Sequence, residues 1–464
     1  MSAASAAARA FFLEGNALLA AGDAAAAEER FRRAVQAAPD LAEAHANLAW
    51  LLERRDGAQA ESAYRRALAL APDIVQLRVN FGAFLARNKR FEESEAAYRQ
   101  AIALDEGSDA AWSNLGVLLA CLKREPEAEA CYRRAIACNP AGTIARFNLG
   151  YLLLRQGRFE EGWPCLEARK GPGPFAAQLS CPRWRGEPLE GKRLLVEFEA
   201  GHGDMIQFCR YAKVLKQAGA WHLAMVCHPA LKALFATLEG VDELVSFDEP
   251  LSAHGWDYWT PILGVPRYCG TTLERIPARL PYLRADPQRV AQWAPLLPTD
   301  GALRVGLVWK GNPHFENDAD RSLPALGLLA PLWAVPGVRF VSLQKGAGER
   351  EAAAAPAARP LLALGARLGD FADTAAVIAQ LDLLICVDTA VAHLAGALGR
   401  RCWVLLPDYR PDWRWLADRG DSPWYPGVMR LFRQSEMGDW EPTIRRVAQA
   451  LAQFAQQGSA IDLR

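Results

Sequence analysis

Residues 381–399 read LDLLICVDTAVAHLAGALG, and this stretch decides the fold of the C-terminal part of the chain. Leu383 to Val387 is a continuous apolar run, as expected for a central parallel strand that is covered on both faces. Asp388 or Thr389 can cap a helix that follows it. A second apolar run, Cys402 to Leu406, restarts the sheet, so the segment predicts a strand–helix–strand unit.

The junction at Asp388 and Thr389 is also the first place to expect a ligand. In open α/β sheets, ligands lie at the carboxyl ends of strands, beside helix N-termini that attract phosphate. We therefore expect a phosphorylated ligand at this junction.

Length and composition restrict the classes of protein to consider. The 464 residues are enough for about three domains, and half of them are apolar. The 53 basic and 53 acidic residues cancel, which argues against a non-specific nucleic-acid binder. No apolar run approaches the ~18 residues of a membrane span. The ten cysteines form no C-x-x-C pair, so we expect reduced core thiols in a cytoplasmic protein and no metal site.

The first third of the chain repeats itself with a period close to 34 residues. The aligned positions are Gly15, Ala49, Gly82, Gly116 and Gly150. Each of the first four is followed by a small residue, an aromatic and an alanine, as in Ala128, Tyr132 and Ala135. Small residues let two helices cross closely, and the aromatic fills the gap between repeat units. The pattern resembles the tetratricopeptide repeat, and only the first half of a fifth unit is kept.

One asparagine recurs in this repeat, two residues before the aligned position. These residues are Asn47, Asn80, Asn114 and Asn148. The first helices of such units line a concave groove, and an asparagine side chain can both donate to and accept from a peptide backbone. The four could bind an extended acceptor polypeptide, or asparagine could simply be common at this place in the repeat.

The rest of the chain predicts two doubly wound α/β halves with a cleft between them. We expect the repeats in residues 1–169, a Pro-rich linker in 170–192, a first half in 193–298 and a second half in 299–464. The predicted strands are 194–198, 223–227, 244–247, 305–309 and 340–343, with helices at 205–218, 229–238 and 374–381.

A glycine-rich turn follows the first of these strands. Gly201, His202 and Gly203 form a loop that lets the backbone approach a ligand closely. It is not a dinucleotide fingerprint, because Ile206 stands where the third glycine would fall. Asp204 comes next, at the start of a helix. It can cap that helix, or it can face the cleft as a general base.

Four motifs in this order resemble the glycosyltransferase family 9 group, whose best-known members are heptosyltransferases with a GT-B fold. They are GHGD at 201–204, GLVWKGN at 306–312, SLQKG at 342–346 and VDTAVAHLAG at 387–396. The tail resembles bacterial proteins that fuse tetratricopeptide repeats to this domain. Its motifs are PDWRW at 411–415, DSPWYP at 421–426 and LFRQ at 431–434.

The resemblance implies roles for individual residues. Asp204 matches the aspartate proposed as catalytic base, and Arg321 lies near a position that contacts phosphate. The residues implied in donor binding are Lys310, Asn312, Arg321, Gln344, Lys345, Asp388, Thr389 and His393. Thr389 and backbone N–H groups at a helix start suit phosphate oxygens, and an arginine can neutralise a leaving group in place of a metal. We expect no cofactor beyond the nucleotide-sugar co-substrate.

These features predict a glycosyltransferase that moves a sugar from a nucleotide-activated donor to a hydroxyl group. The repeats favour a protein acceptor modified on serine or threonine. Bacterial flagellin is the first candidate, because the chain resembles flagellin-modifying enzymes that join repeats to a transferase. One alternative acceptor is a lipopolysaccharide or exopolysaccharide precursor. A second alternative is a catalytically inactive, peptide-binding scaffold.

Overall fold

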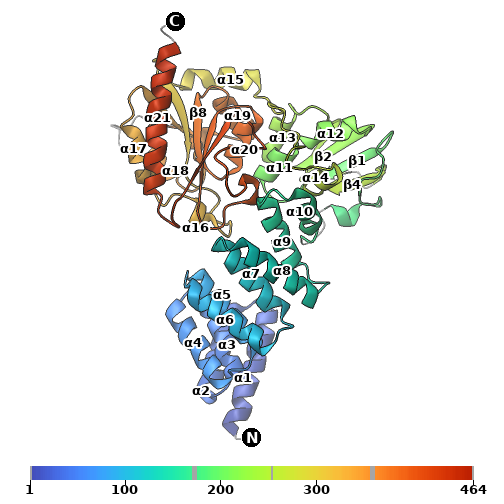
Figure 1. Ribbon diagram of the computed structural model, residues 1–464, viewed down its shortest axis with the longest axis vertical. Helices are drawn as coiled ribbons and strands as arrows, with labels where there is room; N and C mark the ends of the chain where they lie inside the picture. The colour runs from blue at the N-terminus through green and yellow to red at the C-terminus, as the bar shows by residue number, and fades with distance from the viewer. Residues whose placement is uncertain (1–2, 170–174, 252–253, 356–360, 462–464) are drawn as a thin grey trace. The chain divides into compact units, whose positions relative to one another are not determined.

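The chain folds as two compact units, Met1–Leu152 and Leu153–Arg464. The computed structural model describes residues 3–169, 175–251, 254–355 and 361–461 (Figure 1). Residues 170–174 of the predicted linker lie outside the described residues, and the domain boundaries drawn from the sequence stay predictions.

The first unit consists of helices that pack in consecutive pairs, as the repeat predicts. They are α1 (Ala3–Ala20), α2 (Ala24–Ala37), α3 (Ala42–Leu52), α4 (Gly57–Leu70), α5 (Val75–Arg87), α6 (Phe91–Leu104), α7 (Asp109–Cys121), α8 (Glu125–Cys138) and α9 (Ile144–Arg155), within which the unit ends.

Glycine at the aligned positions brings the paired helices together. A Cβ added to Gly82 would lie 2.6 Å from the ring of Tyr98. A Cβ added to Gly116 would lie 2.7 Å from the ring of Tyr132. No side chain fits in the space at Gly82 or Gly116, so the close helix crossing predicted for small residues is confirmed at these two positions.

The second unit begins with α10 (Phe159–Leu166) and contains two sheets in which every strand pairing is parallel. The four-stranded sheet has the order β3-β2-β1-β4 and contains β1 (Arg193–Glu197), β2 (His222–Cys227), β3 (Glu243–Ser246) and β4 (Tyr258–Pro261). Its helices are α11 (His202–Phe208), α12 (Tyr211–Gln217), α13 (Pro229–Phe235) and α14 (Val265–Tyr268).

The six-stranded sheet has the order β10-β9-β8-β5-β6-β7. Its strands are β5 (Leu303–Val308), β6 (Val338–Ser342), β7 (Leu361–Ala363), β8 (Leu383–Val387), β9 (Cys402–Leu406) and β10 (Met429–Arg433). Its helices are α15 (Pro287–Trp293), α16 (Asp318–Arg321), α17 (Ala330–Trp333), α18 (Glu349–Ala353), α19 (Phe371–Ile378), α20 (Ala390–Ala397) and α21 (Glu441–Ile461). The predicted α/β class, with parallel sheets flanked by helices, is confirmed.

Strand order places the loops that matter for function. In each sheet the order reverses at one point, between β1 and β4 in the first sheet and between β5 and β8 in the second. Ligands of open α/β sheets bind outside the carboxyl ends of the strands at such a reversal. The glycine-rich loop follows β1, and the Asp388-Thr389 junction follows β8, so both predicted site segments lie at a reversal point.

The predicted helix 205–218 is interrupted. It forms α11 and α12, which are separated at Cys209 and Arg210. The guanidinium of Arg210 is buried and donates to the carbonyl oxygens of Gln207 and Trp424 at 2.7 Å each, and to the hydroxyl of Tyr282 at 2.9 Å. Sequence periodicity does not show this interruption, because Trp424 and Tyr282 belong to distant segments.

The strands β4, β7 and β10 were not predicted. β4 ends in Pro261, which usually argues against a strand, but β4 is an edge strand of its sheet. Proline is tolerated at an edge because one side of the strand makes no ladder hydrogen bonds.

Gly396 in α20 provides a test of this packing. A Cβ at this position would overlap the ring of Tyr425. We expect Gly396→Ala to lower the free energy of unfolding by about 1–3 kcal/mol, despite the better helix propensity of alanine. Urea denaturation would measure the change. Gly57→Ala is the control, because a Cβ there meets nothing within 4 Å, and equal effects of the two changes would contradict the prediction.

Candidate functional site

The N-terminus of α20 presents an unused polar group. Thr389 is the residue at the helix start, with φ −146° and ψ 170°, but its side chain makes no capping hydrogen bond. Its Oγ1 atom is buried and has no hydrogen-bond partner in the part of the chain that the structure describes. A buried hydroxyl without a partner costs free energy, so this atom is suited to a ligand oxygen.

Asp388 precedes Thr389 and has an altered acidity. Burial and, after it, the neighbouring Asp412 raise the pKa of the Asp388 carboxyl to about 6. The Trp415 indole, Arg321 and Arg414 oppose this rise. Charged side chains thus gather around Asp388 from the loops after β5 and β8 and from the C-terminal tail.

Arg321 enters this place from α16. Its Nε donates to Asp318 at 3.2 Å, and its guanidinium lies 4.4 Å from the centre of the Phe315 ring. Gly311 makes room for the pair, because a Cβ there would lie 2.8 Å from the Nη2 atom of Arg321. The predicted phosphate-contacting arginine is therefore held near Asp388 by its own contacts.

Asp204 lies on α11 and has two partners. Its Oδ2 accepts the backbone N–H of Gly201 at 2.8 Å, so the predicted capping role is confirmed. Its Oδ1 accepts from the Nη2 atom of Arg414, a buried side chain that is 5% exposed. Arg414 also donates to both carboxylate oxygens of Asp412, at 3.0 and 3.1 Å.

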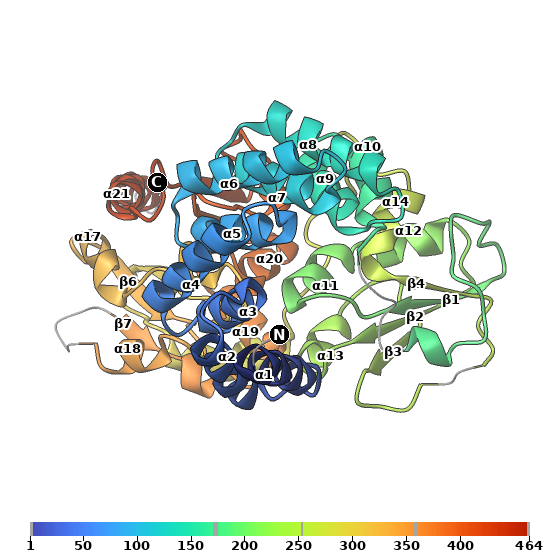
Figure 2. The ribbon, with the colours of Figure 1, turned by 90° about the horizontal axis from the view of Figure 1, so that it is seen from below.

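The glycine-rich loop packs closely against another helix of the same unit. A Cβ at Gly203 would lie 3.0 Å from the ring of His393 and 3.4 Å from the backbone of Ala390. The glycine expected to admit a ligand thus lets α11 pack on the start of α20, and these two helices lie side by side (Figure 2). The close approach of this loop to a ligand stays a prediction, and Gly201 provides the N–H that the Asp204 carboxylate accepts.

The two histidines of the site are held by aromatic neighbours. His393 bonds through Nδ1 to the Tyr425 hydroxyl at 2.9 Å and stacks on Trp415 at 5.1 Å. Burial lowers the pKa of His393 well below its ordinary value, and Arg414 and Arg210 lower it further, so the ring is neutral at pH 7.

His202 lies against His228, with ring centres 4.3 Å apart. Burial and His228 lower the pKa of His202 to about 4. His202 is therefore also neutral at pH 7 and adds no charge to the site.

Four predicted donor-binding residues have partners within the protein. Gln344 is buried, and its amide bonds the backbone of residues 309, 310, 345 and 347. These bonds organise the loops that follow β5 and β6, and the role expected for Gln344 in donor binding stays a prediction. Lys310 pairs with Glu351, and Lys345 donates to the Leu368 carbonyl at 2.6 Å. Asn312 lies in an exposed turn and accepts the N–H of residue 314 at 3.0 Å.

The four asparagines of the repeat are all half-buried. Asn47 donates to Asn16 at 2.8 Å, and Asn80 accepts from Gln76 at 2.7 Å. These two bonds are local, so a bound peptide would have to compete with them or use the remaining amide atoms.

Sequence reasoning missed Arg414, Asp412 and Tyr425 as site residues. The PDWRW motif was quoted only for its resemblance to related proteins, and both of its tryptophans, Trp413 and Trp415, are buried. The signal was an arginine and an aspartate two residues apart in an apolar tail motif.

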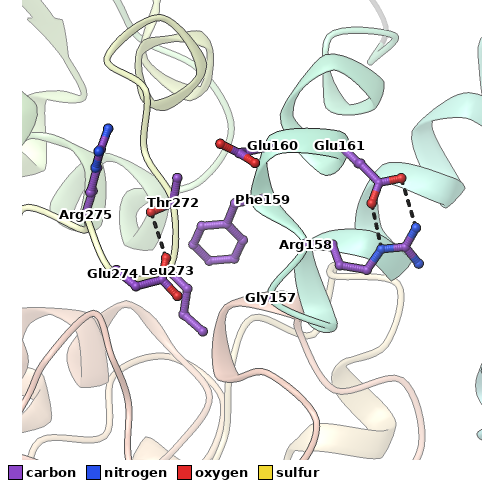
Figure 3. Close-up of a pocket in the computed structure, with 9 residues that line it drawn as sticks. All are labelled: Gly157, Arg158, Phe159, Glu160, Glu161, Thr272, Leu273, Glu274 and Arg275. Atoms are coloured by element: carbon purple, nitrogen blue, oxygen red, sulfur yellow. Dashed lines mark hydrogen bonds and ion pairs between the residues drawn. The ribbon is translucent and has the colours of Figure 1, made fainter.

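A separate pocket of ≈ 540 Å³ lies between the start of α10 and the loop 272–275 (Figure 3). Arg158 and Glu161 form an ion pair beside it, and Thr272 donates to Glu274 at 2.9 Å. None of the predicted site residues lines it. Its wall residue Phe159 packs on Trp424 and Trp413, with ring centres 5.9 and 6.2 Å apart.

The acidity of Asp388 predicts a pH-dependent stability. Its pKa in the folded state, about 6, lies above the ordinary value of 3.8, so ionisation disfavours folding. The carboxylate therefore costs nothing below pH 4, and its cost grows as the pH rises through 6. We expect Asp388→Asn to raise the free energy of unfolding on the order of 1–3 kcal/mol at pH 7.5. Urea denaturation of both proteins at pH 4 and 7.5 measures the difference, and an equal gain at both would contradict it.

Family comparisons agree with the two units. Residues 12–73, 51–111, 83–143 and 126–163 match the tetratricopeptide repeat, and residues 338–406 match glycosyltransferase family 9 (heptosyltransferase). The chain therefore carries tetratricopeptide repeats in its N-terminal region and a family 9 domain in its C-terminal region. The family 9 match contains β6 to β9 and α20, and thus the Thr389 site.

Among individual relatives, the chain is similar to Protein FlbA of Caulobacter vibrioides, with 32% identity over 330 residues. The match covers 65% of this chain and 54% of FlbA, so the chain spans about half the length of this relative. Among solved structures, PilF of Pseudomonas aeruginosa is 22% identical, with a TM-score of 0.34, and the match covers 37% of this chain and 80% of that one. The type IV pilus biogenesis factor PilW is also 22% identical, with a TM-score of 0.33 and coverage of 35% and 75%.

Within the described ranges, no helix is both long and apolar enough to cross a bilayer. The same residues contain no group of three or more His, Cys, Asp or Glu side chains placed to hold a metal ion.

Proposed function

We propose that this protein is a glycosyltransferase of the GT-B type, which moves a sugar from a nucleotide-activated donor to a hydroxyl group of a protein. The observation that carries the proposal is the start of α20. There a buried threonine hydroxyl without a partner in the described part of the chain lies at the N-terminus of a helix, within the residues that match family 9. Arg321 adds a positive charge that acts on the adjacent Asp388. This combination suits a diphosphate.

The reaction follows from these groups. The Asp204 carboxylate takes the proton of the acceptor hydroxyl, and the oxygen attacks the anomeric carbon of the donor sugar. The bond from that carbon to the diphosphate breaks, and the nucleoside diphosphate leaves with the electron pair. The start of α20 and Arg321 stabilise the charge that develops on it. We propose that no metal is needed, so EDTA should leave turnover unchanged.

The repeats support a protein as the acceptor, because tetratricopeptide repeats bind proteins. We propose that serine or threonine of a polypeptide bound along the repeat asparagines is modified, with bacterial flagellin as the first acceptor to test. Replacing Asn114 and Asn148 by alanine should raise KM for the protein acceptor and leave binding of the donor unchanged. A lipopolysaccharide or exopolysaccharide precursor is the alternative acceptor in the same assay.

The test is ligand binding by matched variants. UDP, GDP, ADP, dTDP and CMP, and their sugar derivatives, are screened by thermal shift against wild type, Thr389→Val and Thr389→Ser. A ligand at about 100 times its Kd stabilises a protein by roughly 2.7 kcal/mol. Thr389→Val should leave the unliganded protein at least as stable as before, since the buried hydroxyl has no partner among the described residues, but should weaken binding. Thr389→Ser should bind as wild type does.

If no nucleotide binds the wild type, with or without acceptor, the transferase proposal is wrong and a peptide-binding scaffold replaces it. If binding is equal in Thr389→Val, the donor site lies elsewhere.

A further inference from the structure

Arg414 has a place in the site that the reaction above leaves unexplained. It lies on the segment 411–415, its side chain is buried, and its guanidinium lies 4.6 Å from the ring centre of Trp413 and 5.4 Å from that of Phe208. It donates to Asp204 with one nitrogen and to Asp412 with another. A buried cation held by two carboxylates from different segments is a specific arrangement, because breaking either pair leaves a charge with reduced hydration.

The carboxylate of Asp204 has no oxygen without a donor in this state. Oδ1 accepts from Arg414, and Oδ2 accepts the Gly201 N–H at 2.8 Å. A general base must accept a hydrogen bond from the hydroxyl that it deprotonates. Each oxygen keeps a second lone pair, so an acceptor hydroxyl that reaches Oδ1 has to share this oxygen with the Arg414 guanidinium.

Arg414 also acts on the groups around the start of α20. It lowers the pKa of both His393 and Asp388, which lie on either side of Thr389 in the sequence. Gly203, next to Asp204 in the chain, packs so closely on α20 that an added Cβ would lie 3.4 Å from the backbone of Ala390. The Asp204–Arg414 pair therefore lies beside the start of α20, where the guanidinium can attract a phosphate held at Thr389. Arginine binds phosphate and carboxylate with the same planar fork, so the two anions are direct competitors for it.

We propose that Arg414 is a switch that exchanges Asp204 for the diphosphate of the donor. Without donor, Arg414 occupies the carboxylate. When the diphosphate binds at the start of α20, Arg414 turns to it and keeps its bonds to Asp412, and Asp204 becomes free to accept a hydrogen bond from the acceptor. Donor then binds before acceptor. This inference rests on the proposed function and adds an order of binding and a role for Arg414.

If Arg414 exchanges in this way, replacing Asp204 and replacing Arg414 should change the affinity for a nucleoside diphosphate in opposite directions. The probe is whichever of UDP, GDP, ADP and dTDP binds wild type most tightly, measured by isothermal titration calorimetry. Asp204→Asn should tighten binding roughly fivefold or more, because Arg414 is released, and Arg414→Gln should weaken it by a similar factor. Arg414→Lys, which keeps the charge but loses the fork, should lie between wild type and Arg414→Gln.

The double variant Asp204→Asn/Arg414→Gln separates competition from general repulsion. If the two anions compete through Arg414, Asp204→Asn has no effect in the Arg414→Gln background. If removing a negative charge simply favours an anion, the same tightening persists in that background and the exchange is refuted. Arg419→Gln is the control, because it breaks an Arg–Asp pair of 2.8–2.9 Å elsewhere in the tail and should not change the Kd.

Circular dichroism of each variant checks folding. If Arg414→Gln does not fold, Arg414→Lys shows whether loss of the arginine fork weakens binding of the nucleoside diphosphate. Unchanged binding by Asp204→Asn refutes the exchange and leaves the transferase proposal standing. Failure of every nucleoside diphosphate to bind wild type refutes both.

Discussion

Asp204→Asn is expected to abolish most turnover while the protein still binds its donor. Removal of a general base typically costs about 10²- to 10⁴-fold in rate, so kcat should fall by that factor. Asparagine keeps a side-chain oxygen that can accept the Gly201 N–H, so the fold should persist. Release of the nucleoside diphosphate in the presence of acceptor measures the effect.

Glu239→Gln is the matched control in the same half of the unit. Glu239 pairs with Lys213 at 2.8 Å on the surface, so its loss should change kcat by less than a factor of about two. Full activity of Asp204→Asn would show that another group takes the proton, and the capping bond would then be the whole role of Asp204.

Arg321→Gln is expected to have the second-largest effect. If Arg321 stabilises the charge that develops on the leaving diphosphate, its removal should lower kcat by roughly 10²- to 10³-fold, as for loss of one oxyanion donor. Arg321→Lys should recover part of this rate, because it restores the charge without the planar fork. Steady-state kinetics with saturating donor separates kcat from KM.

The control for this prediction lies on β6. Arg339 pairs with Asp300 at 2.8 Å, and both side chains are nearly half exposed, so Arg339→Gln should leave kcat unchanged. Equal kinetics for the Arg321 and Arg339 variants would remove Arg321 from the mechanism. A lower stability of Arg321→Gln alone would reflect the buried Asp318, which loses its ion pair.

The second sheet shows how far local sequence determines the fold. The run 383–387, the helix after Thr389 and the run 402–406 were predicted where they occur, because a buried parallel strand and a capped helix each leave a local pattern. β4 and β10 were not predicted, since β4 contains proline and both are edge strands with mixed sequences. Edge strands depend on a partner strand more than on their own pattern.

In the candidate site, too, some features could be predicted from local sequence and others could not. Thr389 and Asp388 were found from the sequence, because a strand end followed by a helix start is a local feature. The bonds of the Gln344 amide to four backbone groups of neighbouring loops could not be predicted, because no pattern within residues 342–346 shows them.

The sequence by itself determined the repeat, the two parallel α/β halves and the junction at Asp388 and Thr389. Each of these depends on residues within one turn, one strand or one repeat of each other. Only the tertiary structure decided that Arg414 pairs with Asp204, 210 positions earlier in the chain, and that Asp388 has a pKa of about 6. Ion pairing and acidity depend on burial and on distances between segments, and these exist only after the strands are ordered and the helices packed.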